Sequence, residues 1–432
     1  MTAAASAAIV DDPTLGLRQY LDASPTPFHA GASAAELLQR SGYVEIDEAR
    51  RFPREPGRYL LRRDGSLIAW DSRGGAGSFR VIGAHTDSPN LRIKPQPEVS
   101  RAGWEMLGVE VYGGPLLNSW LDRDLGLAGR VSVRDGSGVR TELLHCAEPL
   151  LRVSQLAVHL DRGVNDRGLV LNPQQHLTPH WGSSSAPVAF DGWLGEQLGV
   201  DAADVLAWEL MTFDLTPARL IGRDQDLLAS GRLDNLATSH AAVQALCSLA
   251  DDETADGTRV IVLFDHEEVG STSATGAGST LLPAVLERIV LAAGGDREDL
   301  LTALARSVVA SGDMAHATHP NYSERHEPEH RIAINGGPVL KINTNLRYAT
   351  DAPGAATFAL ACEQAGVPMQ RFVTRSDLPC GSTIGPTTGA LTGITTVDFG
   401  APMLSMHSAR EVCGALDQPQ YVAALAAFLA PA

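Results

Sequence analysis

The sequence predicts an α/β fold, in which a mixed, mostly parallel sheet is flanked by helices and interrupted by a β-rich insertion. Beyond residue 228, short apolar runs with strand character alternate with longer helical runs, which is the pattern of βα units. Between residues 97 and 228 strand-like runs follow one another, and this stretch holds five of the six tryptophans. We therefore expect one α/β domain built from residues 1–96 and 229–432, with residues 97–228 inserted between its two parts.

The elements expected along the chain follow from apolar spacing. Residues 1–96 contain two helical runs, TLGLRQYLDAS and ASAAELLQRSGY, and then three strand-like runs, RYLLRR, SLIAW and FRVIGAH. The insertion contains the strand-like runs EMLGVEVYG, AGRVSVRD and VRTELLH. The last part begins with DNLATSHAAVQALCSLA, expected as an amphipathic helix, the buried strand RVIVLFD and the helix TLLPAVLERIVLAA. The helix APGAATFALACEQAG, the strand TTVDFG and a C-terminal helix complete the pattern.

Composition excludes several classes of function. With 44% hydrophobic and 20% charged residues, the 432-residue chain can bury a large core. Its formal net charge of −17 argues against nucleic acid or an anionic membrane as a partner. The start, MTAAASAAIVDD, lacks the features of a signal peptide, and no apolar run approaches the roughly 20 residues of a membrane span. Five scattered cysteines fit neither a disulfide framework nor a CxxC zinc site, so a cytoplasmic protein is expected.

A histidine and an aspartate follow the strand-like run FRVI, in the segment GAHTDS. Ligands of open α/β sheets bind at the carboxyl ends of the strands. His85 could therefore bind a metal, while Asp87 accepts the other ring N–H and fixes the orientation of the ring. A turn with a hydrogen-bonded histidine explains the same pair, and for this pair alone it is the more frequent case.

Two acidic segments come next. Asp234, in RLDN at the start of an expected helix, is by itself best explained as a helix cap. The segment DHEEVGS follows the buried strand RVIVLF, and four titratable residues are costly to crowd there unless a cation or solvent compensates. Glu268 could bind a metal while Glu267 takes a proton from water; a solvated acidic loop is the alternative.

Two further segments contain histidine. Asp313 and His316 lie in DMAH, and His407 lies in MHSARE after the strand-like TTVDFG. Flexible polar loops resemble the first segment, and a lone histidine near the C-terminus is usually structural. Five residues together supply two imidazoles and three carboxylates: His85, Asp234, Glu268, Asp313 and His407. This mixed set suits two Zn²⁺ ions sharing one carboxylate, with Mn²⁺ or Co²⁺ as alternatives, and hence hydrolysis by metal-activated water.

Seven ordered motifs resemble those of the aspartyl aminopeptidase / aminopeptidase I family of dinuclear zinc exopeptidases: GAHTDSPNLRIKP, SGRLDNL, DHEEVGS, SGDMAHATHPNY, GPVLKIN, LPCGSTIGP and MHSARE. The resemblance extends from about residue 20 to 425 and implies a zinc exopeptidase-like fold. Residues 97–228 fall where that family carries its dimerisation domain.

The resemblance also implies a role for each metal-site residue. Asp234 would bridge two zinc ions and precede a cis peptide bond to Asn235. His85 and Asp313 would bind one ion, and Glu268 and His407 the other. Glu267 would be the general base, and Asp87 would orient His85.

Five further residues resemble the substrate contacts of the family. His159 would reach the active site of a neighbouring subunit, and His316 would hydrogen-bond the substrate carbonyl. By sequence alone, however, His159 is better explained as a residue of a half-exposed strand. Lys341 would pair with an acidic substrate side chain, which implies a preference for N-terminal Asp or Glu, although some members of the family prefer neutral residues. Tyr348 and Ser382 would line the same pocket.

The family further implies dimers assembled into a tetrahedral dodecamer, which would exclude folded proteins and limit the substrates to peptides. The expected reaction requires that these peptides have a free N-terminus. Two other readings stay open. A related dinuclear carboxypeptidase or deacylase would need a cationic clamp, which Arg347 or Arg410 could supply. An inactive peptide-binding scaffold would keep the fold without catalysis, but the complete ligand set argues against it.

Overall fold

A computed structural model describes residues 12–183, 188–252 and 256–432. The first eleven residues, on which the expectation about the signal peptide depends, lie outside these ranges. The chain divides into two compact units. The first unit comprises the residues up to Asp87, Ala218–Met406 and Glu411–Ala432, and the second comprises Ser88–Pro217 and His407–Arg410. The insertion expected at residues 97–228 overlaps the second unit over residues 97–217.

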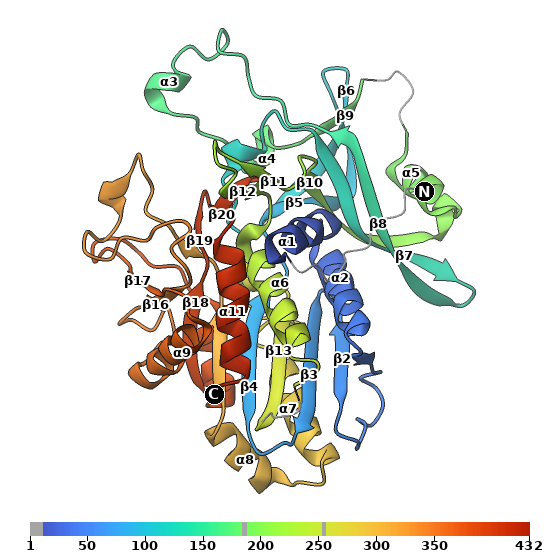
Figure 1. The fold of residues 1–432 in the computed structure, drawn as a ribbon. Helices are drawn as coiled ribbons and strands as arrows, with labels where there is room; N and C mark the ends of the chain where they lie inside the picture. Colours follow the sequence, from blue (N-terminus) through green and yellow to red (C-terminus); the bar gives the residue numbers. More distant parts are fainter. Residues whose placement is uncertain (1–11, 184–187, 253–255) are drawn as a thin grey trace. The chain divides into compact units, whose positions relative to one another are not determined.

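The first unit is built on a sheet that has nine strands in the described part of the chain (Figure 1). Their order across the sheet is β1 (Val44–Glu45), β2 (Arg58–Arg63), β3 (Ser66–Gly74), β13 (Gly257–Phe264), β4 (Phe79–His85), β14 (Val308–Gly312), β18 (Thr395–Gly400), β16 (Val339–Ile342) and β17 (Gln370–Val373). Neighbouring strands run parallel except at the pairs β2–β3, β3–β13 and β16–β18. The prediction of a mixed, mostly parallel sheet is therefore confirmed.

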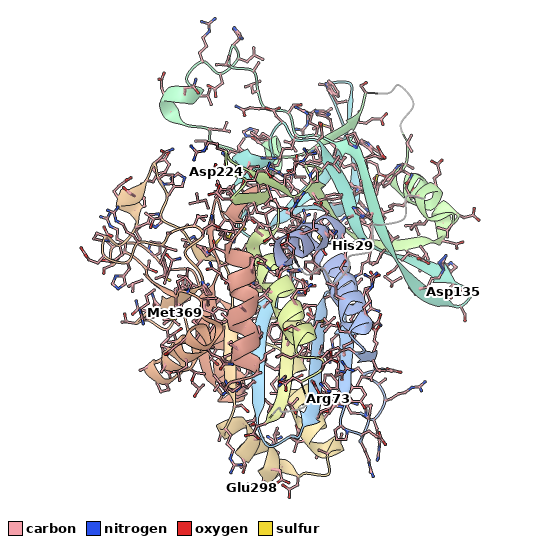
Figure 2. The ribbon with its side chains drawn as sticks, viewed as in Figure 1. His29, Arg73, Asp135, Asp224, Glu298 and Met369 are labelled. Atoms are coloured by element: carbon pink, nitrogen blue, oxygen red, sulfur yellow. The ribbon has the colours of Figure 1, made fainter. Side chains whose placement is uncertain are left out.

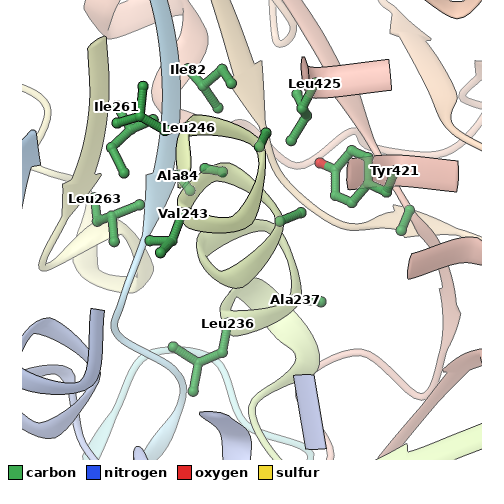
Figure 3. Packing of buried hydrophobic residues seen from close by; sticks show 14 of the residues in the cluster. Ile82, Ala84, Leu236, Ala237, Val243, Leu246, Ile261, Leu263, Tyr421 and Leu425 are labelled. Atoms are coloured by element: carbon green, nitrogen blue, oxygen red, sulfur yellow. The ribbon is translucent and has the colours of Figure 1, made fainter. Parts of the chain in front are cut away.

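Helices cover both faces of this sheet, and the central strands are apolar on both faces for that reason. In β4, Ile82 and Ala84 belong to one core cluster, while Phe79 and Val81 belong to another. Figure 3 shows the first of these clusters, where side chains of β4 and β13 pack with those of α6 (Leu233–Ser248) and α11 (Asp417–Leu429). The same cluster includes residues of α1 (Pro13–Ala23), α2 (Pro27–Arg40) and α9 (Ala352–Ala365). The opposite cluster is covered by α7 (Leu281–Ala292), α8 (Arg297–Ala305) and the start of α10 (Ile384–Thr392).

Helix α6 departs from its expected amphipathic character. Every residue from Leu233 to Cys247 is buried, because the helix contacts β4 and β13 as well as α1, α2 and α11. Small residues such as Ala241 and Ala242 allow this close packing. The helix is therefore a central element of the core, with no solvent-facing stripe along these residues.

The arrangement of the strands brings several polar side chains to one edge of the sheet. Strands β4, β13 and β14 are neighbouring and parallel, so their carboxyl ends meet at the same edge. His85 ends β4, Asp265 follows β13, and Asp313 follows β14. A smaller sheet in the first unit has the order β11 (Arg219–Ile221), β12 (Leu227–Ser230), β20 (Glu411–Gly414), β19 (Pro402–Leu404) and β15 (Ala315–His316).

The second unit contains an antiparallel sheet with six strands in its described residues. Their order is β8 (Gly138–Leu151), β7 (Leu125–Asp135), β10 (Val205–Asp214), β5 (Asn90–Arg101), β6 (Trp104–Tyr112) and β9 (His180–Gly182). Figure 2 marks Asp135 at the tip of the long β7–β8 hairpin. The short helices of this unit are α3 (Val164–Arg167), α4 (Pro173–His176) and α5 (Phe190–Leu198). Phe190 packs against Trp181, Trp193 and Trp208, which explains the concentration of tryptophan in this stretch.

Within the described ranges, no helix combines the length and the apolar character needed to cross a membrane.

His240 makes the stability of the first unit depend on pH. It is buried in α6. Its Nδ1 lies 3.0 Å from Nε2 of Gln418, and its Nε2 lies 3.4 Å from Nε2 of Gln244. Desolvation lowers the pKa of His240 to about 3, so the folded protein keeps the ring neutral. The unfolded chain binds a proton near the ordinary pKa of about 6.5, so stability falls as pH drops from about 6.5 towards 3.

We predict that His240→Gln weakens this pH dependence. The His240 imidazole makes the free energy of unfolding change by up to about 1.4 kcal/mol per pH unit. Its removal should therefore bring the melting temperatures at pH 5 and pH 7 closer together than in the wild type. His176→Gln, which replaces an exposed histidine, is the matched control and should keep the wild-type difference. An unchanged difference in His240→Gln would contradict this account.

Candidate metal centre

His85 lies at the centre of the polar cluster at the carboxyl edge of the sheet. Its ring is almost fully buried at the end of β4, and its Nδ1 lies 3.0 Å from the backbone carbonyl oxygen of Asp87. A carbonyl oxygen only accepts hydrogen bonds, so Nδ1 carries the hydrogen. His85 Nε2 then faces the carboxylates of Asp234 at 3.5 Å and Asp313 at 3.8 Å. The imidazole is thus held in the tautomer that a metal ligand needs.

Asp87 has a second contact that the sequence did not indicate. Its carboxylate accepts hydrogen bonds from the backbone N–H groups of Glu267, at 3.0 Å, and Glu268, at 3.1 Å. Oδ1 of the same carboxylate lies 3.4 Å from Nδ1 of His85. A single buried carboxylate therefore fixes both the histidine that ends β4 and the short 3₁₀ turn Glu267–Val269 that follows β13.

Asp234 does not cap a helix. The residue before the first turn of α6 is Arg232, in a left-handed conformation, and no side chain caps this helix end. The backbone N–H of Asp234 donates to Oε2 of Glu411 at 3.2 Å, and the peptide bond to Asn235 is cis. The amide of Asn235 donates to the carbonyl of Gly312 at 2.8 Å, so this segment is tied to the residue before Asp313. The helix-cap interpretation was wrong because the carboxylate is directed to His85.

Within the described residues of the first unit, two overlapping groups of side chains are close enough to hold a cation. Ligand atoms of His85, Asp234 and Asp313 lie within 4.8 Å of one another, and so do those of His85, Glu267 and Glu268. The donors are one imidazole nitrogen and carboxylate oxygens, a combination that suits zinc and similar divalent ions. On donor chemistry and spacing, these side chains fit a metal ion.

The electrostatics of the metal-free protein lead to the same conclusion. Burial alone would lower the pKa of His85, but hydrogen bonds to Asp234, Asp313 and Asp87 outweigh it and hold the pKa well above its ordinary value. Burial raises the pKa of Glu267, and the neighbouring carboxylates raise it further, while His85 opposes them. Without a metal, this cluster therefore stabilises positive charge and disfavours additional negative charge at the edge of the sheet.

Lys341, on β16, is enclosed beside this cluster. Its ammonium group donates to the carbonyl of Met314 at 3.1 Å and lies 3.8 Å from Oδ2 of Asp313. The same nitrogen lies 5.0 Å from the centre of the Tyr348 ring. Desolvation, followed by the positive charge of Lys341, lowers the pKa of His316, which favours a neutral imidazole there. His316 also contacts Phe372, with 6.0 Å between ring centres.

Ser382 is hydrogen-bonded to the segment that contains Tyr348. Its hydroxyl donates to the carbonyl of Arg347 at 3.2 Å, and Tyr348 is almost fully buried between Lys341 and Phe372. The structure therefore brings Lys341 and Tyr348 into contact and places Ser382 one hydrogen bond from the residue before Tyr348.

Two of the expected site residues, His159 and His407, belong to the second unit. His159 lies in an exposed turn, so the half-exposed strand expected there is wrong. His407 heads the segment His407–Arg410, and its Nδ1 lies 3.0 Å from the carbonyl oxygen of Gly114. That hydrogen bond leaves Nε2 as the atom with the lone pair.

The cationic clamp required by a carboxypeptidase or deacylase gains no support from Arg410. Its guanidinium donates to the backbone carbonyls of Thr216 at 2.9 Å and Pro217 at 3.2 Å. These bonds already engage the group within the second unit.

Two buried acids near the site were missed. Glu411 belongs to the motif MHSARE but had no assigned role, and it accepts the N–H of Asp234. Asp398 accepts hydrogen bonds from Ser311 and Thr383. The available signal for Asp398 was its position as a charged residue in the apolar strand TTVDFG.

Comparison with known proteins identifies the family. The model of the family "Aminopeptidase I zinc metalloprotease (M18)" matches residues 20–429. The chain is 54% identical over 422 residues to a probable M18 family aminopeptidase 2 of Mycobacterium bovis, covering 96% of this chain and 97% of that protein. Among solved structures, that of the Ape4 and Nbr1 complex is 37% identical with a TM-score of 0.93, covering 97% of this chain and 85% of that one. The S. cerevisiae mApe1 dodecamer is 27% identical with a TM-score of 0.84, covering 96% of each chain.

The family match extends over most of the chain, and the candidate metal ligands lie within the matched residues. The chain belongs to the M18 family and is a zinc metalloaminopeptidase.

Proposed function

We propose that this aminopeptidase removes N-terminal residues from peptides, preferring Asp and Glu, with Glu267 as the general base. The observation that carries the mechanism is the convergence of His85, Asp234 and Asp313 with the Glu267–Glu268 turn at one edge of the sheet. A buried carboxylate, that of Asp87, ties these two parts together through backbone hydrogen bonds.

The proposed centre holds two metal ions in each subunit. Asp234 would be the carboxylate shared by both ions, His85 and Asp313 would hold one ion, and Glu268 and His407 would hold the other. The tautomer that Gly114 imposes on His407 supports its assignment, because Nε2 then has the lone pair needed for metal binding. Zinc is the expected metal, with Mn²⁺ or Co²⁺ as alternatives.

The bound ions would supply Lewis-acid polarisation of the substrate carbonyl and lower the pKa of water at the site. Glu267 would take the proton of the attacking water and later deliver it to the departing amine. Its environment suits this task, since burial and neighbouring carboxylates favour the protonated form and so make the carboxylate a stronger base. Asp87 keeps Glu267 in position through its backbone N–H.

His316 is proposed to donate a hydrogen bond to the oxygen of the scissile carbonyl as negative charge develops there. Its lowered pKa supports this role, because a neutral imidazole keeps one N–H donor without adding a full positive charge beside Lys341. Tyr348 and Ser382 would line the adjoining pocket for the N-terminal side chain.

The acidic preference depends on Lys341. A cation beside the proposed pocket would attract a substrate carboxylate, and burial would strengthen that attraction. The contacts of Lys341 with Asp313 and the carbonyl of Met314 favour a second candidate, in which the lysine positions Asp313 and the enzyme prefers neutral N-terminal residues.

The insertion, residues 97–228, is proposed as the dimerisation domain, with His159 reaching the active site of the neighbouring subunit. Exposed apolar side chains flank His159 and support a subunit contact there: Leu156, Val158 and Leu160. Dimers are proposed to assemble into a tetrahedral dodecamer, as the dodecamer of S. cerevisiae mApe1 suggests.

A cytoplasmic location is also proposed, supported by the absence of any disulfide among the five cysteines, all of which lie in described ranges. Cell fractionation tests the location.

Replacement of Glu267 by Gln should separate metal binding from catalysis. The variant keeps a side chain of nearly the same shape but cannot accept the proton, so we expect turnover to fall by at least about a hundredfold. Metal analysis should find two zinc ions per chain in both proteins. The substrates are peptides that begin with Asp, Glu, Leu, Lys or Ala. Activity retained in the variant would overturn the role of Glu267, and turnover of acylated amino acids alone would favour a deacylase.

Lys341→Met tests the origin of the specificity. If Lys341 pairs with the substrate, the ratio of kcat/KM for N-terminal Asp over Leu should fall by about tenfold or more, while zinc content is retained. Lys94→Met is the matched control, because it removes the other lysine of the chain, which donates to Gln174 in the second unit. An unchanged ratio in Lys341→Met would remove Lys341 as the selector. Faster release of Leu by the wild type would favour the neutral preference.

The assembly can be checked by light scattering on the native protein. A dodecamer of 45.7 kDa chains is expected. A stable mass corresponding to a dimer would contradict the proposed cage and leave the catalytic proposal intact.

A further inference from the structure

Asp398 is a buried charge inside an otherwise apolar strand. It lies between Val397 and Phe399 on β18, and none of these three residues is exposed to solvent. A carboxylate in such a place is costly unless hydrogen bonds or a nearby cation compensate for the lost water. The contacts of Asp398 therefore indicate what keeps it there.

Three donors from three separate segments converge on this carboxylate. The hydroxyl groups of Ser311 and Thr383 each donate to Oδ1 at 2.6 Å, and the backbone N–H of Ala349 donates to Oδ2 at 2.5 Å. The hydroxyl of Thr350 also accepts the backbone N–H of Asp398 at 2.9 Å. All three groups donate to the carboxylate, so each contact uses one of its oxygen atoms as the acceptor.

The backbone of α10 packs closely against the carboxylate. A Cβ atom at Gly385, in the first turn of α10, would clash with Oδ2 of Asp398. Lys341 approaches from the neighbouring strand, because Leu340 pairs with Phe399 in the antiparallel β16–β18 ladder. Burial raises the pKa of Asp398, whereas the charge of Lys341 and the three donors oppose this shift.

Each donor lies within two residues of a residue of the proposed active site. Ser311 is in β14, two residues before Asp313, while Ala349 directly follows Tyr348 and Thr383 directly follows Ser382. Among the described residues, Asp398 belongs to none of the groups of side chains that are close enough to hold a metal ion. It is thus placed to act on the site through its neighbours.

We propose that Asp398 is a positioning residue that holds the Tyr348 and Ser382 segments against the strand leading to Asp313, through one carboxylate shared by Ser311, Thr383 and Ala349. The assignment rests on the proposed roles of Tyr348 and Ser382 in substrate binding. Its function is to fix the position of the substrate-pocket residues relative to the metal ligands.

Asp398→Asn tests the proposal in the zinc-loaded enzyme. The amide has the same shape but presents N–H donors where a donor already points, so one contact must break. We expect kcat/KM to fall by about tenfold or more, mainly through a higher KM, while zinc content stays at the wild-type level. Thr383→Val should show a smaller loss of the same kind, and Thr383→Ser, which keeps the hydroxyl, should restore the wild-type KM.

Asp417→Asn is the matched control for removing a buried carboxylate. Asp417 is also buried in the first unit and accepts the N–H groups of Asn335 at 2.8 Å and Gly337 at 3.0 Å. We expect this variant to lower the melting temperature without changing KM. The same KM increase in Asp417→Asn would show that the effect reports general destabilisation and would overturn the proposal.

Hydrogen exchange provides a readout that does not depend on catalysis. In Asp398→Asn, amide exchange should become faster in peptides covering residues 343–351 and 380–385, while exchange in α6 and α7 stays unchanged. An unchanged exchange rate in both segments, or a wild-type KM, would overturn the positioning role. Absence of aminopeptidase activity in the wild type would instead count against the proposed function, and the exchange result would still decide whether Asp398 holds these segments.

Discussion

The crowding of carboxylates around His85 is the constraint on which the rest of the site depends. Asp87, Asp234 and Asp313 all approach one buried imidazole, and Glu267 lies 4.0 Å from the same ring. Like charges in a buried site repel unless positive charge, or hydrogen bonds to the charged form, compensate. Here the compensation comes from the proton that these carboxylates hold on His85, from Lys341 and from the backbone N–H groups that Asp87 accepts. In a zinc peptidase, the metal ions would take over the role of that proton.

Such a cluster can persist only on a rigid support. Strands β4, β13 and β14 are buried on both faces, and helix α6, which is buried from Leu233 to Cys247, carries Asp234 against the end of β4. The polar groups that surround the cluster are themselves fixed by other buried groups, such as Glu411 on the N–H of Asp234 and Asn235 on the carbonyl of Gly312. Hydrogen bonds to backbone groups therefore position the ligands, and the apolar core keeps these backbone segments in place.

The enclosure of Lys341 joins the residue proposed to select the substrate to the candidate metal centre. The same ammonium group contacts Asp313, the carbonyl of Met314 and the Tyr348 ring, and its charge acts on both His316 and Asp398. A substrate carboxylate would therefore compete with, or share, a charge that the protein already uses. Under the proposed function, the choice between acidic and neutral N-terminal residues would depend on this one buried cation.

The sequence by itself determined the α/β class, the mostly parallel sheet and the candidate ligands, because apolar runs record which strands are buried and polar residues at their ends record where the sheet ends. Glu267 and Glu268, for example, could be recognised as candidates from their position directly after RVIVLF. Only the tertiary structure decided that Asp234 faces His85 instead of capping a helix, that Asp87 holds the Glu267–Glu268 turn, and that α6 is buried all round. These features depend on contacts between segments far apart in the chain, such as Asp87 with Glu267 or Asp398 with Ser311. Local sequence patterns do not predict which distant group will donate a hydrogen bond to a buried carboxylate.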